Sequence, residues 1–232
     1  MNAEQFEQTL RRMDAGVFIL ADAARVIQKP TPYCKLYLAR LKKTGRIRHI
    51  ERGKYALSDT DLHAVASSIA HPSYLSFLSA LSFHHLTTQI PIVEQVAVVR
   101  PRKPLDYAGT KIQFICLKKE AFFGFSLVDG VRVADPEKAI LDSLYLPEQA
   151  PLSETLQALR QADLDLGKLA EYAERLDSGI VNKRLGFLLG KAGIFYNFKL
   201  PHNRKNDPIN PSAPARGPVD KRWNLIINEV LE

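Results

Sequence analysis

Apolar residues recur at helical spacing near the start of the chain. Spacings of four and then three predict a helix over 3–14, with inward positions Phe6, Leu10 and Met13. Gly16 is expected to end this helix, because glycine readily takes the left-handed conformation that closes helices. After a short apolar segment, the stretch DAARVIQ predicts a second helix with inward positions Ala23, Val26 and Ile27.

A third helix and a hairpin complete the pattern of the first sixty residues. Pro30 stops the second helix, since the residue before a proline avoids the helical conformation. The third helix is predicted from Pro32 to about Thr44, with Thr31 as its N-cap. Its inner face is expected to hold Cys34, Leu41 and either Tyr37 or Leu38. The extended segments IRHI and KYAL then flank a glycine turn and predict a β-hairpin over 47–57.

The periodicity changes from Asp59 onward. A linking helix capped by Asp59 or Thr60 is expected to stop at His71-Pro72. Ser73 is then expected to cap a helix over YLSFLSALSFHHL, which is apolar nearly all round and therefore predicted to be buried.

Alternating apolar residues predict strands in the middle of the chain. Two strands are expected over 94–100 and 111–118, separated by the turn-forming stretch PRKPLDYAG. A hairpin turning at Asp129-Gly130 follows. Asp135 is then predicted as the N-cap of a helix whose first residue is Pro136.

The last third of the chain is predicted to be helical and then irregular. Three helical stretches are expected over 153–162, 166–176 and 180–193, packed on the sheet. Residues 199–222 are rich in Pro, Asn and Arg and predict an irregular basic arm. A final strand is expected to alternate through Trp223, Leu225 and Ile227.

These elements predict an α+β protein with two parts. Helix, helix, short turn, helix and hairpin is the order of a winged helix-turn-helix, which we assign to residues 1–58. Residues 59–232 are predicted to form a mixed α/β domain, a small sheet packed by helices, which carries the basic arm.

Charge is concentrated in the first of these parts. The chain carries +7 overall, but residues 25–54 hold ten Lys/Arg against one acid, a net charge of +9. The arm over 199–222 carries +4, which leaves the rest of the chain at −6. A dense basic patch on a slightly acidic body is typical of a polyanion-binding surface.

The patch and the predicted helices together indicate duplex DNA as the ligand. In a winged helix the third helix enters the major groove, where residues near its N-terminus reach base edges and long cations reach phosphates. The hairpin cations would contact the adjacent backbone or minor groove. The predicted DNA-binding residues are Thr31, Tyr33, Lys35, Leu36, Arg40, Lys43, Arg46, Arg48, Arg52 and Lys54.

Nothing in the sequence calls for an enzyme, a cofactor or a metal. The chain has no glycine-rich phosphate loop, Cys/His metal spacing or nucleophile elbow. Asp129, Asp135 and Glu137 could suggest a metal-dependent nuclease, but a capped helix start explains most of that cluster. His84 and His85 would point about 100° apart on a helix, so one is expected to be packed and the other exposed.

The compartment follows from what the sequence lacks. No apolar run approaches the length of a membrane span, and the N-terminus has no signal-peptide pattern, so a cytoplasmic protein without membrane contact is expected. Cys34 and Cys116 each lie in an apolar pattern and are expected to be buried free thiols.

Several blocks of the chain resemble the AbiEi family of antitoxins and related transcriptional regulators. The family's G-x-Y-x-L ending corresponds to Gly53, Tyr55 and Leu57. Its P-S-Y-(I/L)-S block and the following S-A-L-x-x-H-x-L correspond to Pro72, Ser73, Tyr74, Leu75, Ser76, Ser79, Ala80, Leu81, His84 and Leu86. The segments VRVADPEKAILDSLYLP (131–147), IVNKRLGFLLG and RWNLIIN resemble later family blocks, so the resemblance covers nearly the whole chain.

This resemblance implies a type IV toxin–antitoxin (abortive infection) system. The N-terminal winged helix would repress its own operon by binding promoter inverted repeats. Two copies of the protein would then bind the two half-sites as a dimer on DNA. The C-terminal domain would counter a nucleotidyltransferase-like toxin without forming a stable complex. The main alternative is a transcriptional regulator whose body senses a ligand and neutralises no toxin.

Overall fold

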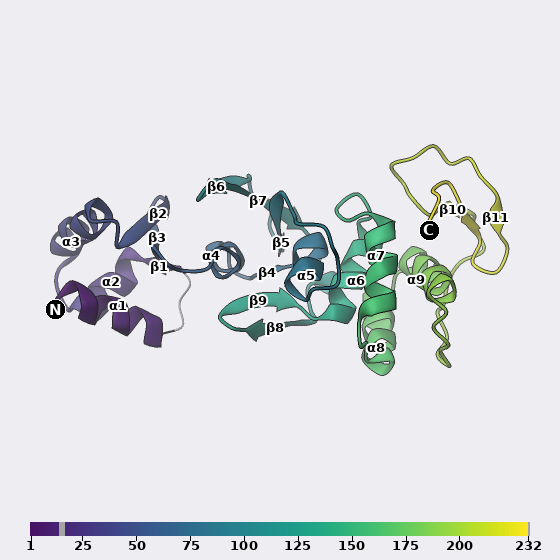
Figure 1. Ribbon diagram of the computed structural model, residues 1–232, viewed down its shortest axis with the longest axis horizontal. Helices are drawn as coiled ribbons and strands as arrows, with labels where there is room; N and C mark the ends of the chain where they lie inside the picture. The colour runs from purple at the N-terminus through teal and green to yellow at the C-terminus, as the bar shows by residue number, and fades with distance from the viewer. Residues whose placement is uncertain (14–16, 232) are drawn as a thin grey trace.

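The computed structural model describes residues 1–13 and 17–231 as an elongated molecule of mixed α+β structure (Figure 1). The N-terminal elements form one end, a six-stranded sheet lies in the middle, and helices followed by the C-terminal arm form the other end. The α+β class expected from the sequence is confirmed. Among the described helices, none has the length and apolar character that a bilayer crossing requires.

The N-terminal part contains three helices and a small antiparallel sheet of order β1-β3-β2. Its elements are α1 (Ala3–Arg12), β1 (Phe18–Ile19), α2 (Leu20–Ile27), α3 (Thr31–Lys43), β2 (Ile47–Glu51) and β3 (Lys54–Leu57). Their inner faces form a hydrophobic cluster of Phe6, Leu10, Phe18, Ala23, Ile27, Cys34, Leu38, Leu41, Ile47 and Leu57. The predicted helices and hairpin are confirmed, and Leu38 rather than Tyr37 takes the inner position.

Helix ends in this part differ from the predictions. Met13 is 46% exposed, because α1 ends at Arg12 and Met13 follows it as the C-cap. Pro30, not Thr31, is the N-cap of α3, and Thr31 is its first residue. The expected end of the first helix at Gly16 lies outside the described residues.

The central sheet has the strand order β6-β7-β5-β4-β9-β8. Its strands are β4 (Ser73–Leu75), β5 (Val93–Val98), β6 (Leu105–Tyr107), β7 (Thr110–Cys116), β8 (Phe125–Val128) and β9 (Val131–Ala134). The pairs β5–β7 and β4–β9 are parallel, and the others are antiparallel. The hairpin at Asp129-Gly130 is confirmed, with both turn residues at positive φ as a tight hairpin turn requires.

The helix predicted from Ser73 is wrong at its start. Residues Ser73–Leu75 form a strand between β5 and β9, and the helix α5 (Phe77–Phe83) begins only after its N-cap Ser76. All three strand residues are buried, since α4 (Leu62–Ile69) covers one face of β4 and the later helices cover the other. A strand buried on both faces has no alternation, so its apolar run resembles a buried helix.

Three further local predictions need correction. Asp61, not Asp59 or Thr60, caps α4 by accepting hydrogen bonds from the backbone of His63 (2.8 Å) and Ala64 (3.2 Å). The stretch 101–109, predicted as a turn, contains the edge strand β6. Cys116 is exposed rather than buried. It is the last residue of β7, and alternation within a strand does not show whether other elements pack over the end of that strand.

Helices from α6 onward pack at the far side of the sheet, away from the N-terminal part (Figure 1). They are α6 (Pro136–Tyr145), α7 (Leu152–Gln161), α8 (Leu166–Leu176) and α9 (Gly179–Ala192), and a short 3-10 turn, η1 (Lys119–Ala121), precedes them. The three helices expected over the last third of the chain are confirmed, but they pack mainly on α6 and on one another rather than directly on the sheet. As expected, His85 is exposed, while His84 lies with its Nε2 2.8 Å from the carbonyl oxygen of Ala134.

The C-terminal arm is mostly irregular, and side chains of α9 hold it against the body of the protein. It contains β10 (Asp207–Pro208) and β11 (Val219–Asp220), and β12 (Leu225–Ile226) follows it, so the predicted final strand is two residues long. Three consecutive side chains of α9 bind the arm. The Asn182 amide donates to the Pro201 carbonyl (2.7 Å), Lys183 pairs with Asp207 (2.7 Å), and Arg184 donates to the Ile209 carbonyl (2.9 Å).

Candidate nucleic-acid interface

The outward face of α3 carries most of the predicted DNA-binding residues. Its inner residues are fixed in the N-terminal core, so helical spacing directs the others to solvent. Tyr33 is 49% exposed and Leu36 is 64% exposed. The other exposed members of this face are Thr31, Lys35, Arg40 and Lys43, and we call these six residues the α3 face.

The cations of the α3 face have no ionic partner among the residues that the structure describes. Within the described part of the chain, Lys35, Arg40 and Lys43 form no ion pair and no cation–π contact. Arg40 and Lys43 lie in the last turn of α3, where the helix dipole favours positive charge. The face therefore presents uncompensated positive charge to an external anion.

Tyr33 is held by a neighbouring aromatic ring. Its ring stacks on Tyr37, with centroids 6.4 Å apart and planes at 13°. Tyr37 in turn packs edge-on against Phe6 at 5.5 Å. Burial, with smaller contributions from Tyr33 and Glu7, raises the pKa of Tyr37, whose buried hydroxyl finds no partner among the described residues. The stacking on Tyr37 thus fixes the orientation of the Tyr33 ring, and about half of the Tyr33 surface remains exposed to solvent.

The hairpin cations divide into free and engaged groups. Arg48 and Arg52 are exposed and form no ion pair with a described residue. Arg46 binds Glu7 of α1 at 2.9 Å, so an external anion would compete with that carboxylate. Lys54, also predicted to bind DNA, is engaged within the protein. Its ammonium donates to the Ile69 carbonyl (2.5 Å) and pairs with Glu51 (2.9 Å), which directs it to the body of the protein.

The tip of the hairpin is docked on the body. Glu51 accepts from Arg102 at 2.5 Å, while Ile50 and Ala56 belong to the hydrophobic cluster of the body. Burial opposes ionisation of Glu51, but hydrogen bonds from Arg102 and Lys54 outweigh it and lower the pKa of this carboxyl. The hairpin therefore contributes to both hydrophobic clusters and links α3 firmly to the sheet.

A groove beside α3 is lined by residues that were not among the predicted DNA-binding residues, together with Arg48, which was. A cavity of about 510 Å³ is lined by Lys42, Arg48 and His49 on one side and by Asp106, Tyr107 and Ala108 on the other. The second side belongs to β6 and its turn, a stretch interpreted as a plain turn from the sequence. Lys42 was detectable only as one member of a basic run, because its neighbours across the groove are distant in sequence.

The acidic residues considered for a nuclease do not form a metal site. In residues 1–13 and 17–231, no group of three or more His, Cys, Asp or Glu lies close enough to hold a metal ion. Lys168 lies 3.0 Å from Asp135 and 3.4 Å from Glu137, so one ammonium is shared by both carboxylates, while Asp129 is in the hairpin turn. Asp135 is the N-cap by position, yet its carboxylate accepts from Ser126 (2.7 Å) and Tyr172 (2.8 Å) instead of the helix backbone.

A fully buried ion pair lies next to this cluster. Lys138 and Asp142 of α6 pair with no exposed surface, and Asp142 also accepts from Tyr74 (3.0 Å) and Ser76 (2.7 Å). Burial and the nearby Asp142 raise the pKa of Tyr74 well above its usual value. These contacts join the strand β4 to α6.

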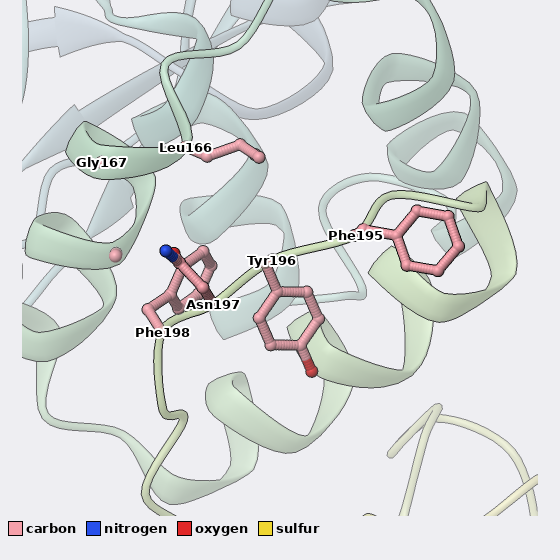
Figure 2. A pocket seen from close by; sticks show the side chains of 7 residues that line it. Leu166, Gly167, Phe195, Tyr196, Asn197 and Phe198 are labelled. Carbon is pink, nitrogen blue, oxygen red and sulfur yellow. The ribbon is translucent and has the colours of Figure 1, made fainter.

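A second hollow lies at the opposite end of the molecule from α3. Residues of α8 and of the segment after α9 line a cavity of about 510 Å³, with Leu166, Gly167, Ala170, Phe195, Tyr196, Asn197 and Phe198 around it. Figure 2 shows Tyr196 between Phe198 and Phe195, and Phe195 is 96% exposed. The hollow is aromatic and carries no charged side chain, so it is not part of the basic surface.

Comparison with known proteins supplies the fold alone. No family model matches the chain, and its sequence matches no curated protein. Among solved structures, the chain is similar to the RV2827C protein from Mycobacterium tuberculosis, with a TM-score of 0.63 and 11% sequence identity. The match covers 96% of this chain and 90% of the other, so the similarity extends over both the N-terminal part and the body.

Proposed function

We propose that this protein binds duplex DNA through the α3 face, as a winged helix-turn-helix whose wing is the β2–β3 hairpin. The observation that carries the proposal is the set of exposed, unpaired cations on a helix that the N-terminal core holds rigidly. A basic helix of this kind fits the major groove. On α9, by contrast, Lys183 and Arg184 are buried on internal partners.

Roles within the interface follow from side-chain length and position. Tyr33 and Lys35, near the start of α3, reach base edges together with Thr31 and Leu36. Arg40, Lys43, Arg48 and Arg52 bind phosphates, and Arg46 does so only in competition with Glu7. Lys54 is left out of the proposed interface because it serves the junction with the body.

Fluorescence anisotropy with a labelled duplex from the promoter of the protein's own gene tests this proposal. Replacing Arg48 and Arg52 with Ala is expected to weaken binding to every sequence alike, whereas Tyr33→Ala changes which sequence is preferred. The matched control replaces Lys199 and Arg204, two exposed cations of the arm, and is expected to leave affinity almost unchanged. Equal losses in both pairs would contradict a localised interface.

The cellular role that we propose rests on the resemblance to the AbiEi family. The protein would act in the cytoplasm as a non-enzymatic autorepressor at inverted repeats and as the antitoxin of a nucleotidyltransferase-like toxin, without a stable complex. Co-expression of the full chain with such a neighbouring gene, from an independent promoter, tests the second role. Rescue of growth by a chain with Lys35, Arg40 and Lys43 replaced by Ala would separate antitoxicity from DNA binding. Failure of the unmodified chain to rescue would contradict the antitoxin role and leave a ligand-responsive regulator.

A further inference from the structure

A basic crevice lies where the hairpin meets the body. It has a volume of about 420 Å³, within the range of small-ligand sites, and its apolar lining residues are Ala70, Pro72, Val98, Val99 and Pro101. Its polar lining consists of Lys54, His71, Arg100 and Arg102. None of its described lining residues is acidic, and a crevice lined by one sign of charge concentrates counter-ions.

Two cations of this crevice, Lys54 and Arg102, already bind a carboxylate of the protein itself. Glu51 gives one carboxylate oxygen to Lys54 (2.9 Å) and the other to Arg102 (2.5 Å). The ring of Phe114 packs against the Arg102 guanidinium at 4.6 Å and holds it in place. This arrangement is how paired cations recognise carboxylates and phosphates in proteins.

Hydrogen-bonding capacity remains at the crevice after these contacts. Lys54 has three donors, of which Glu51 and the Ile69 carbonyl take two. Arg100 is exposed, and its guanidinium forms no hydrogen bond, ion pair or ring contact with the described residues. A planar guanidinium with all its donors free, beside a second one and an ammonium, is suited to a doubly charged oxyanion.

We propose that this crevice binds a free small molecule bearing phosphate groups, held between Lys54 of the hairpin and Arg100 and Arg102 of the body. Such a ligand contacts both parts of the protein at once. It therefore binds only the arrangement in which hairpin and body meet, and stabilises that arrangement by its binding free energy. The inference does not rest on DNA binding, because a chain without duplex affinity can still hold the anion.

Isothermal titration calorimetry of the full chain with inorganic pyrophosphate, at constant ionic strength, tests the proposal. Arg100→Ala is expected to weaken binding at least about tenfold, because it removes a charge-assisted contact. Lys103→Ala is the matched control, since it removes an equal charge from the same exposed loop but lies outside the crevice lining. Glu51→Gln is expected to tighten binding, because it removes the carboxylate that competes for Lys54 and Arg102.

The outcomes separate this proposal from its competitors. Weaker binding in R100A, unchanged binding in K103A and tighter binding in E51Q would support it. No measurable binding by the unmodified chain, or equal losses in R100A and K103A, would overturn it in favour of diffuse attraction. If R100A instead lowered duplex affinity and left pyrophosphate binding intact, the crevice would belong to the DNA interface and the proposal would also fall. Pyrophosphate binding by a chain with no duplex affinity would contradict the proposed function alone.

Discussion

Two helices of this protein use the same residue types in opposite ways. On α3, Lys35, Arg40 and Lys43 are exposed and unpaired within the described chain. On α9, Lys183 is fully buried and Arg184 is 4% exposed, and both bind groups of the C-terminal arm. The comparison shows that burial and internal partners, more than residue type, decide whether a cation stabilises the fold or remains available to a ligand.

Burial explains the behaviour of the α9 cations. Removing a charge from water is costly unless partners replace the water. Lys183 has Asn203 (2.8 Å), Asp207 and the Lys205 carbonyl, and Arg184 has three backbone carbonyls. Desolvation lowers the pKa of Arg184 to about 10, with Glu148 and Asp207 opposing it, so Arg184 is still charged at neutral pH. Four predictions follow, in order of their expected effect on stability.

The largest effect is expected from Lys183→Ala. This change leaves Asp207 with only the exposed Lys205 at 3.8 Å and removes the buried ammonium from Asn203, and breaking a buried pair costs about 3–5 kcal/mol of unfolding free energy. Urea denaturation measures the loss. Lys191→Ala, at an exposed position of the same helix, is the control and is expected to change stability by less than about 0.5 kcal/mol. Equal losses of stability in the two variants would contradict the claim that the buried cation stabilises the fold more than the exposed one.

The next effect comes from the contact between α9 and Trp223, which directly follows the arm. An added Cβ at Gly186 would lie 2.1 Å from Cζ2 of Trp223, so Gly186→Ala must displace the indole at a cost of about 1–3 kcal/mol. Trp223 is the only tryptophan of the chain, so its fluorescence reports the displacement. At Gly190 an added Cβ meets nothing within 4 Å, and Gly190→Ala is expected to be neutral or stabilising. An unchanged emission spectrum in G186A would argue against this packing.

A smaller and pH-dependent effect is expected from His63. Its Nδ1 lies 3.1 Å from Glu94, and that hydrogen bond, opposed by desolvation, raises the pKa of His63 above its usual value. Because the folded pKa is the higher one, the stabilisation is complete below about pH 6.5 and is lost as pH rises through the raised pKa. His63→Gln should remove this slope, worth up to about 1 kcal/mol for a partly exposed pair. His85→Gln, an exposed control, should keep it; a slope that persists in H63Q would assign it to another group.

The smallest effect on stability is expected on α3 itself. Replacing Lys35, Arg40 and Lys43 with Ala removes no side-chain hydrogen bond, ion pair or ring contact with a described residue, and alanine favours helices. The free energy of unfolding in urea should change by less than about 0.5 kcal/mol per site. A loss as large as that of K183A would mean that these cations support the fold.

Local patterns made the α3 face predictable, and distant contacts hid the rest. Helical spacing placed Cys34 and Leu41 inside, with either Tyr37 or Leu38 between them, and so directed Lys35 and Arg40 outward. The sequence offered no signal that Lys54 would turn toward Ile69, fifteen residues away, or that Glu51 would meet Arg102. The strand β4 escaped prediction for a similar reason, because its conformation depends on pairing with β5 and β9 rather than on its own apolar run.

The same limit applies to residues whose position was predicted correctly. Asp135 begins α6 as expected, but its carboxylate is used by Tyr172 and Lys168, more than thirty residues later. A capping pattern identifies where a helix starts and cannot say which partner the side chain finally takes.

The most direct test of the central claim is the salt dependence of duplex affinity. The triple variant K35A/R40A/K43A is compared with K199A/R204A/R216A, which removes the same charge from the arm. If α3 binds phosphates, the first variant loses affinity and its plot of log affinity against log salt flattens by about one unit per lost phosphate contact. The arm variant should keep the slope of the unmodified chain. Equal slopes in both variants would contradict the account, because they would make the cations of α3 no different from any other exposed charge.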